Sequence, residues 1–301
     1  MKIIEAHLVP EDVGNIRLQE YAPSVFKGIS TRQGIKKAIK KEMIHVNGTP
    51  ASTGLWVKPR QKIELLDLEL PPSKIYKLRL DVVYEDECIA IINKPGGICV
   101  SGNQFRTVQN ALPFNLRPSM SDNALPVFNP VHRIDSPTCG LLLIAKTADA
   151  NVHLGNQFAN RTIKKRYRAV VIGNLQEKGI IEMEINGKGA KTSFQLVNKL
   201  RSIRNNFLSM VDLYPETGRT HQLRIHMAGI GMPILGDKMY GTEGEILRGK
   251  GLFLCATELQ FIHPKSQKQM NIVIDEPYKF GRFMEMEQKR WEKYGSEVID
   301  L

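Results

Sequence analysis

The segment His132–Gly140 carries the residue types that most clearly suggest chemistry, a single carboxylate beside a cation. Asp135 follows Arg133 by two positions, and Pro137 and Gly140 interrupt the backbone just before the apolar run 141–145. A side chain on a shaped loop that feeds a buried strand is well placed for binding or catalysis. A solvated ion pair between Arg133 and Asp135 is the commoner explanation when such a pair occurs alone.

A second polar cluster, further along the chain, argues against a simple surface ion pair. Residues 218–226 read Gly-Arg-Thr-His-Gln-Leu-Arg-Ile-His, and residues 231–237 read Gly-Met-Pro-Ile-Leu-Gly-Asp. On a helix, His221 and His226 would not share a face. We therefore expect them to pack or to form hydrogen bonds rather than to bind a metal.

Together these segments resemble the RluA family of RNA pseudouridine synthases. The family pattern is His-Arg-Leu-Asp-x-x-Thr-Ser-Gly, followed later by Gly-Arg-Thr-His-Gln-Ile-Arg-x-His and Gly-x-Pro-Ile-x-Gly-Asp. Ile134 and Cys139 stand where the pattern has Leu and Ser, and neither change touches a group that must ionise. The run 91–98, Ile-Ile-Asn-Lys-Pro-Gly-Gly-Ile, is similar to the family's Asn-Lys-Pro-x-Gly element. The resemblance extends from about Leu80 to Pro264.

The resemblance implies that Asp135 is the catalytic residue of a uridine isomerase. Converting uridine to pseudouridine breaks the bond from ribose C1′ to N1 and remakes it from C1′ to C5. A carboxylate can assist by attacking C1′, by attacking the base ring or by removing a proton from the sugar. The sequence leaves these three routes open. Because the reaction needs no redox step and no external nucleophile, we expect no cofactor and no metal.

The same resemblance implies two roles for arginines, one as the partner of Asp135 and one in base flipping. Arg224 is the expected cationic partner that favours the charged form of Asp135, and Arg219, on the approach to the helix, is the competing choice. A uridine in a duplex or a stack must be flipped before it can react. Arg133 is expected to fill the vacated space, because guanidinium planes stack on bases.

The segment 165–169, Lys-Arg-Tyr-Arg-Ala, resembles the family motif Lys-x-Tyr-x-Ala and so assigns Tyr167 to the active site. A tyrosine that opens a strand would otherwise pack in the core. Its ring can stack on the flipped uracil, and its hydroxyl can exchange protons with the base. Because the rearranged base must lose its C5 proton and few other bases occur in the motifs, we expect the hydroxyl to take part in proton transfer. Lys165 and Arg219 are expected to contact RNA.

The chain is basic, since 42 Lys and Arg residues against 31 Asp and Glu give a net charge of +11 with neutral histidines. Acid-free basic stretches at 27–41, 161–168 and 185–211 favour contact with phosphates. No apolar run approaches the ~20 residues of a membrane span, and the N-terminus lacks a signal-peptide pattern. The four cysteines lack Cys-x-x-Cys spacing, so free thiols are expected.

Residues 1–72 are expected to form a small S4-like RNA-binding domain that ends at Pro71-Pro72-Ser73. Ser30 and Thr31 can cap a helix whose apolar positions 35, 38 and 39 share one face. Gln61 departs from the family pattern, which usually has Asp before the last strand. A compact helix and hairpin with no binding role is the alternative. The basic residues assigned to RNA here are Arg32, Lys36, Lys37 and Lys40.

Residues 73–301 are expected to form a catalytic domain of α+β type with a mixed, largely antiparallel sheet. Strands are predicted at 78–84, 89–92, 140–145, 167–172, 180–185, 192–198, 207–213 and 271–274. Helices are predicted at 107–112, 148–159, 222–229 and 279–294. Consecutive strands from Tyr167 to Leu213 imply antiparallel neighbours rather than a doubly wound sheet.

Two other functions share these features. A noncatalytic RNA-binding or ribosome-assembly protein could keep the scaffold, but it would not need a carboxylate that repels phosphate. A base-excising glycosidase would use the same carboxylate and release uracil. We expect a cytoplasmic monomer that binds RNA and no membrane. Large-subunit ribosomal RNA is favoured, because S4-like modules are more usual on family members that act there, and transfer RNA is the alternative.

Overall fold

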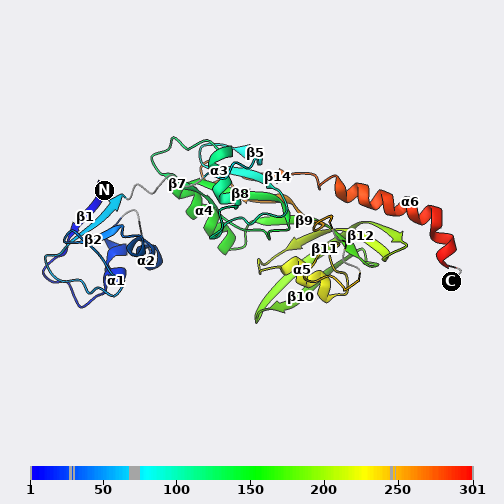
Figure 1. The fold of residues 1–301 in the computed structure, drawn as a ribbon, viewed down its shortest axis with the longest axis horizontal. Helices are drawn as coiled ribbons and strands as arrows, with labels where there is room; N and C mark the ends of the chain where they lie inside the picture. Colours follow the sequence, from blue (N-terminus) through cyan, green and yellow to red (C-terminus); the bar gives the residue numbers. More distant parts are fainter. Residues whose placement is uncertain are drawn as a thin grey trace. The chain divides into compact units, whose positions relative to one another are not determined.

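The chain divides into two compact units, Met1–Ser73 and Lys74–Leu301. The computed structural model describes residues 2–26, 29, 31–67, 75–244, 247 and 249–299 (Figure 1). The expected linker at 71–73 and the expected cap Ser30 lie outside the described residues, as does the basic residue Lys27.

The first unit packs short helices against a small antiparallel sheet. Its elements are β1 (Lys2–Leu8), α1 (Leu18–Tyr21), the 3₁₀ turn η1 (Ala22–Ser24), α2 (Arg32–Lys40), β2 (Ile44–Val46), β3 (Thr49–Pro50) and β4 (Lys62–Asp67), with strand order β1-β4-β2-β3. Thr31 caps α2 by accepting a hydrogen bond from the Gly34 amide at 3.0 Å. Ile35, Ala38 and Ile39 of α2 are buried in the core of this unit.

Side chains close the turns around β4. The amide oxygen of Gln61 accepts a hydrogen bond from the Lys58 amide at 2.8 Å, so Gln61 closes the turn that precedes β4. Asn47 adopts a left-handed backbone with φ of +51°, and its side-chain oxygen accepts a hydrogen bond from the Lys62 amide at 2.8 Å. Asn tolerates this conformation because its short side chain bonds locally.

The second unit is built on a long mixed sheet. Its strands are β5 (Asp81–Glu85), β6 (Ile89–Lys94), β7 (Ala124–Pro130), β8 (Cys139–Thr147), β9 (Lys164–Ile172), β10 (Lys178–Ile185), β11 (Lys188–Ser202), β12 (Asn206–Pro215), β13 (Leu254–Ile262) and β14 (Gln269–Val273). The order is β10-β11-β12-β9-β13-β8-β6-β5, with β14 beside β13 and β7 beside β8. Of the strand pairs described, β8 with β13 is parallel and the others are antiparallel. The predicted α+β class with a largely antiparallel sheet is confirmed.

Helices cover the sheet and complete its cores. They are α3 (Val108–Asn115), α4 (Ala148–Ala159), α5 (Gln222–Gly229) and α6 (Lys279–Ile299). Leu154 of α4 packs with β6 and β8, whereas Leu223 and Met227 of α5 pack with β9 and β12. Figure 1 shows the strands β5–β8 with α3 and α4 on one side of β9, and β10–β12 with α5 on the other.

In the second unit two strands, β7 and β13, escaped prediction and β5 begins later than predicted, and in the first unit β1 was not predicted either. The central strand β13 carries small and polar residues such as Ala256 and Thr257, so it lacks the β-branched run that signals a strand, although β8 and β9 flank it. Strand β7 was also missed. Strand β5 begins at residue 81 rather than at the predicted residue 78. Residues 78–80 do not pair with β6, because the side chain of Asn115 forms hydrogen bonds with the backbone of Leu78 and Leu80.

Gly140 explains how β8 approaches β13 at the end of the Asp135 loop. Its φ of +108° lies in the region that L side chains rarely adopt, and a Cβ there would collide with the backbone carbonyl of Ala256. These two residues are register partners in the parallel pair. Glycine is therefore required at this junction by both backbone conformation and space.

Candidate active site

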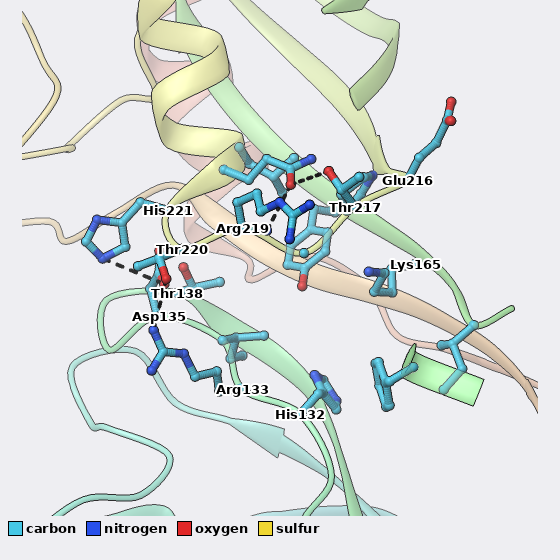
Figure 2. Close-up of a pocket in the computed structure, with 18 of the residues that line it drawn as sticks. His132, Arg133, Asp135, Thr138, Lys165, Glu216, Thr217, Arg219, Thr220 and His221 are labelled. Carbon is cyan, nitrogen blue, oxygen red and sulfur yellow. Dashed lines mark hydrogen bonds and ion pairs between the residues drawn. The ribbon is translucent and has the colours of Figure 1, made fainter. Parts of the chain in front are cut away.

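A cavity of about 430 Å³ in the second unit brings together residues that are distant in sequence. Asp135 comes from the loop between β7 and β8, Tyr167 from β9 and Arg224 from α5. The expected RNA-contacting residues Arg133, Lys165 and Arg219 also line this cavity. Figure 2 shows Arg133, Thr220 and His221 gathered around Asp135, with Lys165 towards the opposite side.

Arg224 connects the two carboxylates of the site. Its Nη1 lies 3.4 Å from Oδ2 of Asp135, while Nε and Nη2 donate to both oxygens of Asp237 at 2.7 and 2.8 Å. Arg224 is 5% exposed and Asp237 only 1%, whereas the Asp135 side chain keeps 20% of its surface accessible. The guanidinium is thus anchored by the buried carboxylate and directed at the accessible one.

The environment keeps the anchoring pair charged. Burial disfavours the charge on Arg224, but its hydrogen bonds and ion pairs with Asp237 and Asp135 raise the pKa of the guanidinium above its ordinary value. Burial would likewise raise the pKa of Asp237, yet hydrogen bonds from Arg224 and from the amides of Met239 and Tyr240 hold that pKa below its usual range. A charge therefore persists beside Asp135.

Arg219, the competing candidate for the partner of Asp135, contacts a backbone carbonyl instead. Nε and Nη2 of Arg219 donate to the carbonyl of Gly189 at 3.3 Å, at the start of β11. Gln222 holds the same corner, because its side-chain oxygen accepts from the Thr217 hydroxyl and the Arg219 amide at 2.6 and 3.0 Å. Its amide nitrogen donates to Lys191 and Thr192. This motif therefore fixes the start of α5 onto β11, and Arg224 follows one half-turn later.

Lys94 anchors the Asp135 loop through hydrogen bonds to backbone carbonyls, a role that the sequence motif did not reveal. Its fully buried ammonium donates to the carbonyls of Pro95, Ile98 and Ser136 at 2.8, 2.9 and 3.1 Å. Burial lowers the pKa of Lys94 to about 8, although the Asp135 charge opposes the shift. The Asn-Lys-Pro-x-Gly element thus supports the Asp135 loop.

A backbone–backbone hydrogen bond adds to this support. The Gly97 amide donates to the carbonyl of Ser136 at 2.7 Å, and a Cβ on Gly96 would come within 2.9 Å of the Pro137 carbonyl. The close approach of the two loops explains Gly96, and a φ of +94° explains Gly97, where the sequence alone indicated only a turn.

Tyr167 lies half-buried between the apolar clusters on the two sides of β9. Burial and the negative charge of Asp135 raise the pKa of its phenol well above the ordinary value. Its hydroxyl is therefore in the protonated form near neutral pH. In this form the hydroxyl can donate a hydrogen bond, and the proton-accepting role expected from the sequence would require it to ionise first.

Residues flanking Asp135 line the same cavity. The ring of His132 stacks on Phe158 with centroids 4.8 Å apart, and its Nε2 accepts a hydrogen bond from the Leu143 amide at 3.0 Å. Burial, with a smaller contribution from Lys165, lowers the pKa of His132 to about 3, so the ring is neutral. Arg133 is exposed, and its Nη2 donates to the Thr220 hydroxyl at 3.2 Å.

His221 is the residue of the site that sequence reasoning underrated. It forms the expected hydrogen bond, with Nδ1 3.0 Å from the Tyr240 hydroxyl, but its Nε2 also lies 3.9 Å from Oδ1 of Asp135. Its place between Thr220 and Gln222 within the motif was the signal that could have marked it. His226, in contrast, is fully buried, in keeping with a packing role.

The basic stretches differ in how many of their side chains are available to contact RNA. Lysines 36, 37 and 40 are exposed on α2 of the first unit, where Arg32 pairs with Glu20 at 2.9 Å. The stretch 161–168 is only partly free, because Arg168 pairs with Asp212 at 2.7 Å and Arg166 with Glu258 at 3.2 Å. These two arginines join strands, so they are less available for phosphate contacts than the exposed residues of the stretch.

The described residues contain neither a metal-binding cluster nor a helix suited to a membrane. No group of three or more His, Cys, Asp or Glu side chains there is arranged to hold a metal ion. None of the helices in those residues is long and apolar enough to cross a membrane.

Comparison with known proteins places the chain among RNA-modifying enzymes. Residues 89–229 match the family model described as RNA pseudouridylate synthase. A Zymomonas mobilis protein named ribosomal large subunit pseudouridine synthase D is 35% identical, over 79% of this chain and 84% of its own length. A protein of the same name from Nitrosomonas europaea is 30% identical, over 86% of this chain and 80% of its own.

A solved structure agrees with the fold. The human RNA pseudouridylate synthase domain containing 1 protein superposes with a TM-score of 0.56 at 24% identity, covering 70% of this chain and 87% of that protein. The mixed sheet with its helices is therefore the fold of this class.

Proposed function

The chain belongs to the RluA-type family of RNA pseudouridine synthases, and we propose that it isomerises specific uridines of large-subunit ribosomal RNA. The relatives from Zymomonas mobilis and Nitrosomonas europaea carry names that specify this RNA. The net charge of +11 suits a polyanionic substrate. Transfer RNA remains the alternative substrate.

The observation that carries the proposed mechanism is the Asp135–Arg224 contact at 3.4 Å, inside a cavity of about 430 Å³. An isolated carboxylate in such a cavity is costly, and Arg224 offsets this cost because Asp237 fixes its orientation. Asp135 then acts on the ribose or on the base of a uridine flipped out of its stack. Arg133 fills the space that the base leaves, and the ring of Tyr167 stacks on the flipped base.

We further propose that residues 1–72 act as an S4-like RNA-binding domain and residues 73–301 as the catalytic domain. The exposed lysines 36, 37 and 40 on α2 support this division, since their opposite face is buried in the unit's own core. Lys165 and Arg219 add positive charge at the rim of the catalytic cavity.

Mapping pseudouridines across total RNA, from cells with and without this protein, tests the substrate. We expect a small set of large-subunit ribosomal uridines to lose the modification when the protein is absent. Loss confined to transfer RNA would reject the ribosomal assignment. Free uracil and abasic sites in purified reactions would indicate a base-excising glycosidase instead.

Replacing one carboxylate tests the mechanism. Asp135→Asn is close to isosteric and removes a negative charge that faces phosphates, so we expect turnover to be abolished while RNA affinity stays unchanged or rises slightly. Turnover and RNA binding are measured on the same purified protein. A variant that keeps more than a few per cent of wild-type turnover would remove Asp135 from the mechanism.

A further inference from the structure

His221 lines the cavity, and among the described residues its Nε2 makes no hydrogen bond. The 3.9 Å between Nε2 and Oδ1 of Asp135 is too long for a hydrogen bond. About a quarter of the His221 side chain, 26%, is exposed to the cavity. A substrate atom held at Asp135 would therefore lie within reach of an uncommitted ring nitrogen (Figure 2).

The backbone of His221 is held in an uncommon conformation. It is the residue before α5, with φ of +56° and ψ of 20°, and its side chain makes no capping hydrogen bond to the helix. A left-handed residue other than glycine is maintained only where its surroundings enforce it, and such residues concentrate at functional sites. Here the conformation directs the ring towards Asp135 instead of towards the helix amides.

We propose that His221 is the base that takes the C5 proton in the last step of the isomerisation. This proposal rests on the proposed function of the site. Once the C1′–C5 bond has formed, C5 still carries its hydrogen. Nε2 of the imidazole accepts that proton, the electron pair of the C5–H bond returns to the ring, and N1 takes up a proton. One proton thus moves from C5 to N1, and no other reactant is consumed.

Electrostatics favour proton transfer to His221 at this last step. On the two routes that act at the sugar, Asp135 is a free carboxylate again when the C5 proton must leave. A negative charge 3.9 Å from Nε2 stabilises the imidazolium that forms. If Nδ1–H donates to the Tyr240 hydroxyl, the tautomer with a free Nε2 is the one present. Tyr167 is less suited to the task, because its phenol is held in the protonated form.

Two substitutions remove the base and suit the backbone. His221→Asn and His221→Gly both tolerate a left-handed residue, so the variants should fold and bind RNA like the wild-type protein. The substrate is a ribosomal RNA fragment that the wild-type protein modifies, with either hydrogen or deuterium at C5 of the target uridine. Modification by the wild type establishes the activity independently of His221.

We expect turnover to fall by ~10²–10⁴-fold in both variants. In both, deuterium at C5 should slow turnover, because C5–H cleavage has become the slow step, and it should have no effect in the wild type. Added imidazole should restore part of the activity of His221→Gly. Near-normal turnover would overturn the proposal. So would a loss of turnover without a C5 isotope effect, which would indicate that His221 only positions Asp135. An isotope effect confined to Tyr167→Phe would assign the step to Tyr167.

Discussion

At the scale of single residues, one guanidinium contacts both the proposed catalytic carboxylate and a buried carboxylate. Arg224 is shared between Asp135, which faces the cavity, and Asp237, which is 1% exposed. Removal of the arginine leaves a buried carboxylate without its charge partner. Breaking a buried ion pair on one side costs far more than replacing both partners.

Because Arg224 contacts both carboxylates, its loss should lower both turnover and stability, and a double variant can separate these two effects. Arg224→Met should be inactive and less stable by ~3–5 kcal/mol, because the Asp237 charge is left unpaired. Adding Asp237→Asn removes that charge and should recover much of the stability without recovering turnover. Thermal unfolding and turnover measured on all three proteins check the prediction. If Arg224→Met keeps its activity, the ion pair is not needed and Arg219 becomes the candidate.

Tyr167 provides a second test at this scale. Burial and the Asp135 charge raise the pKa of the phenol, so the hydroxyl should act as a donor and Tyr167→Phe should retain most of its turnover. Tyr167→Ala loses the stacking ring and should weaken binding of the flipped base by ~1–3 kcal/mol. A Phe variant slowed by ~100-fold or more would show that the hydroxyl transfers a proton, as expected from the sequence.

At the scale of elements, His132 couples the Asp135 loop to β8 in a way that depends on pH. Its neutral ring accepts a hydrogen bond from the Leu143 amide and stacks on Phe158. The pKa of His132 is lowered to about 3 in the folded protein by burial and by Lys165. Between this value and the ordinary pKa of ~6.5 the unfolded chain binds the proton and the folded chain does not.

The free energy of unfolding should therefore fall as the pH drops from about 6.5 towards about 3. His132→Gln keeps an acceptor for the Leu143 amide and cannot titrate, so its stability should depend less steeply on pH in this interval. Denaturant unfolding of the two proteins at several pH values gives the comparison, in which carboxylates common to both cancel. Equal slopes would mean that His132 is protonated in the folded state.

At the scale of the whole molecule, the two units have separate cores, with the first formed by residues such as Leu18, Ile35 and Ile63. Deleting residues 1–73 should leave a folded second unit that still modifies a short RNA. Its affinity for a long structured RNA should fall and depend less on salt, because fewer phosphates are neutralised. Titrations at several salt concentrations measure both effects.

A matched substitution separates charge from folding in the same experiment. Lys36, Lys37 and Lys40 are exposed on α2, so changing them to Gln should preserve the fold. Each of these lysines that neutralises a phosphate in the wild type should reduce the salt slope by about 1 when it is replaced. An insoluble truncation, or unchanged binding of the long RNA by both proteins, would contradict a modular RNA-binding unit.

The sequence determined the local features of this protein. Helices α4 and α5 begin and end at the predicted residues, and the ordered motifs point to the RNA-modifying family. The largely antiparallel sheet follows from consecutive strands without helices between them. These are properties of neighbouring residues, which short-range patterns carry directly.

Only the tertiary structure decided which distant residues meet. It brought Asp135 beside Arg224, the partner that the resemblance favoured over Arg219. It also assigned Lys94 to the support of the Asp135 loop and paired Arg166 and Arg168 with carboxylates of other strands. It also brought His221 beside Asp135. A sequence gives the type of each charged group, but its role depends on the charges around it. Those charges come together only when β13 closes the sheet between β8 and β9.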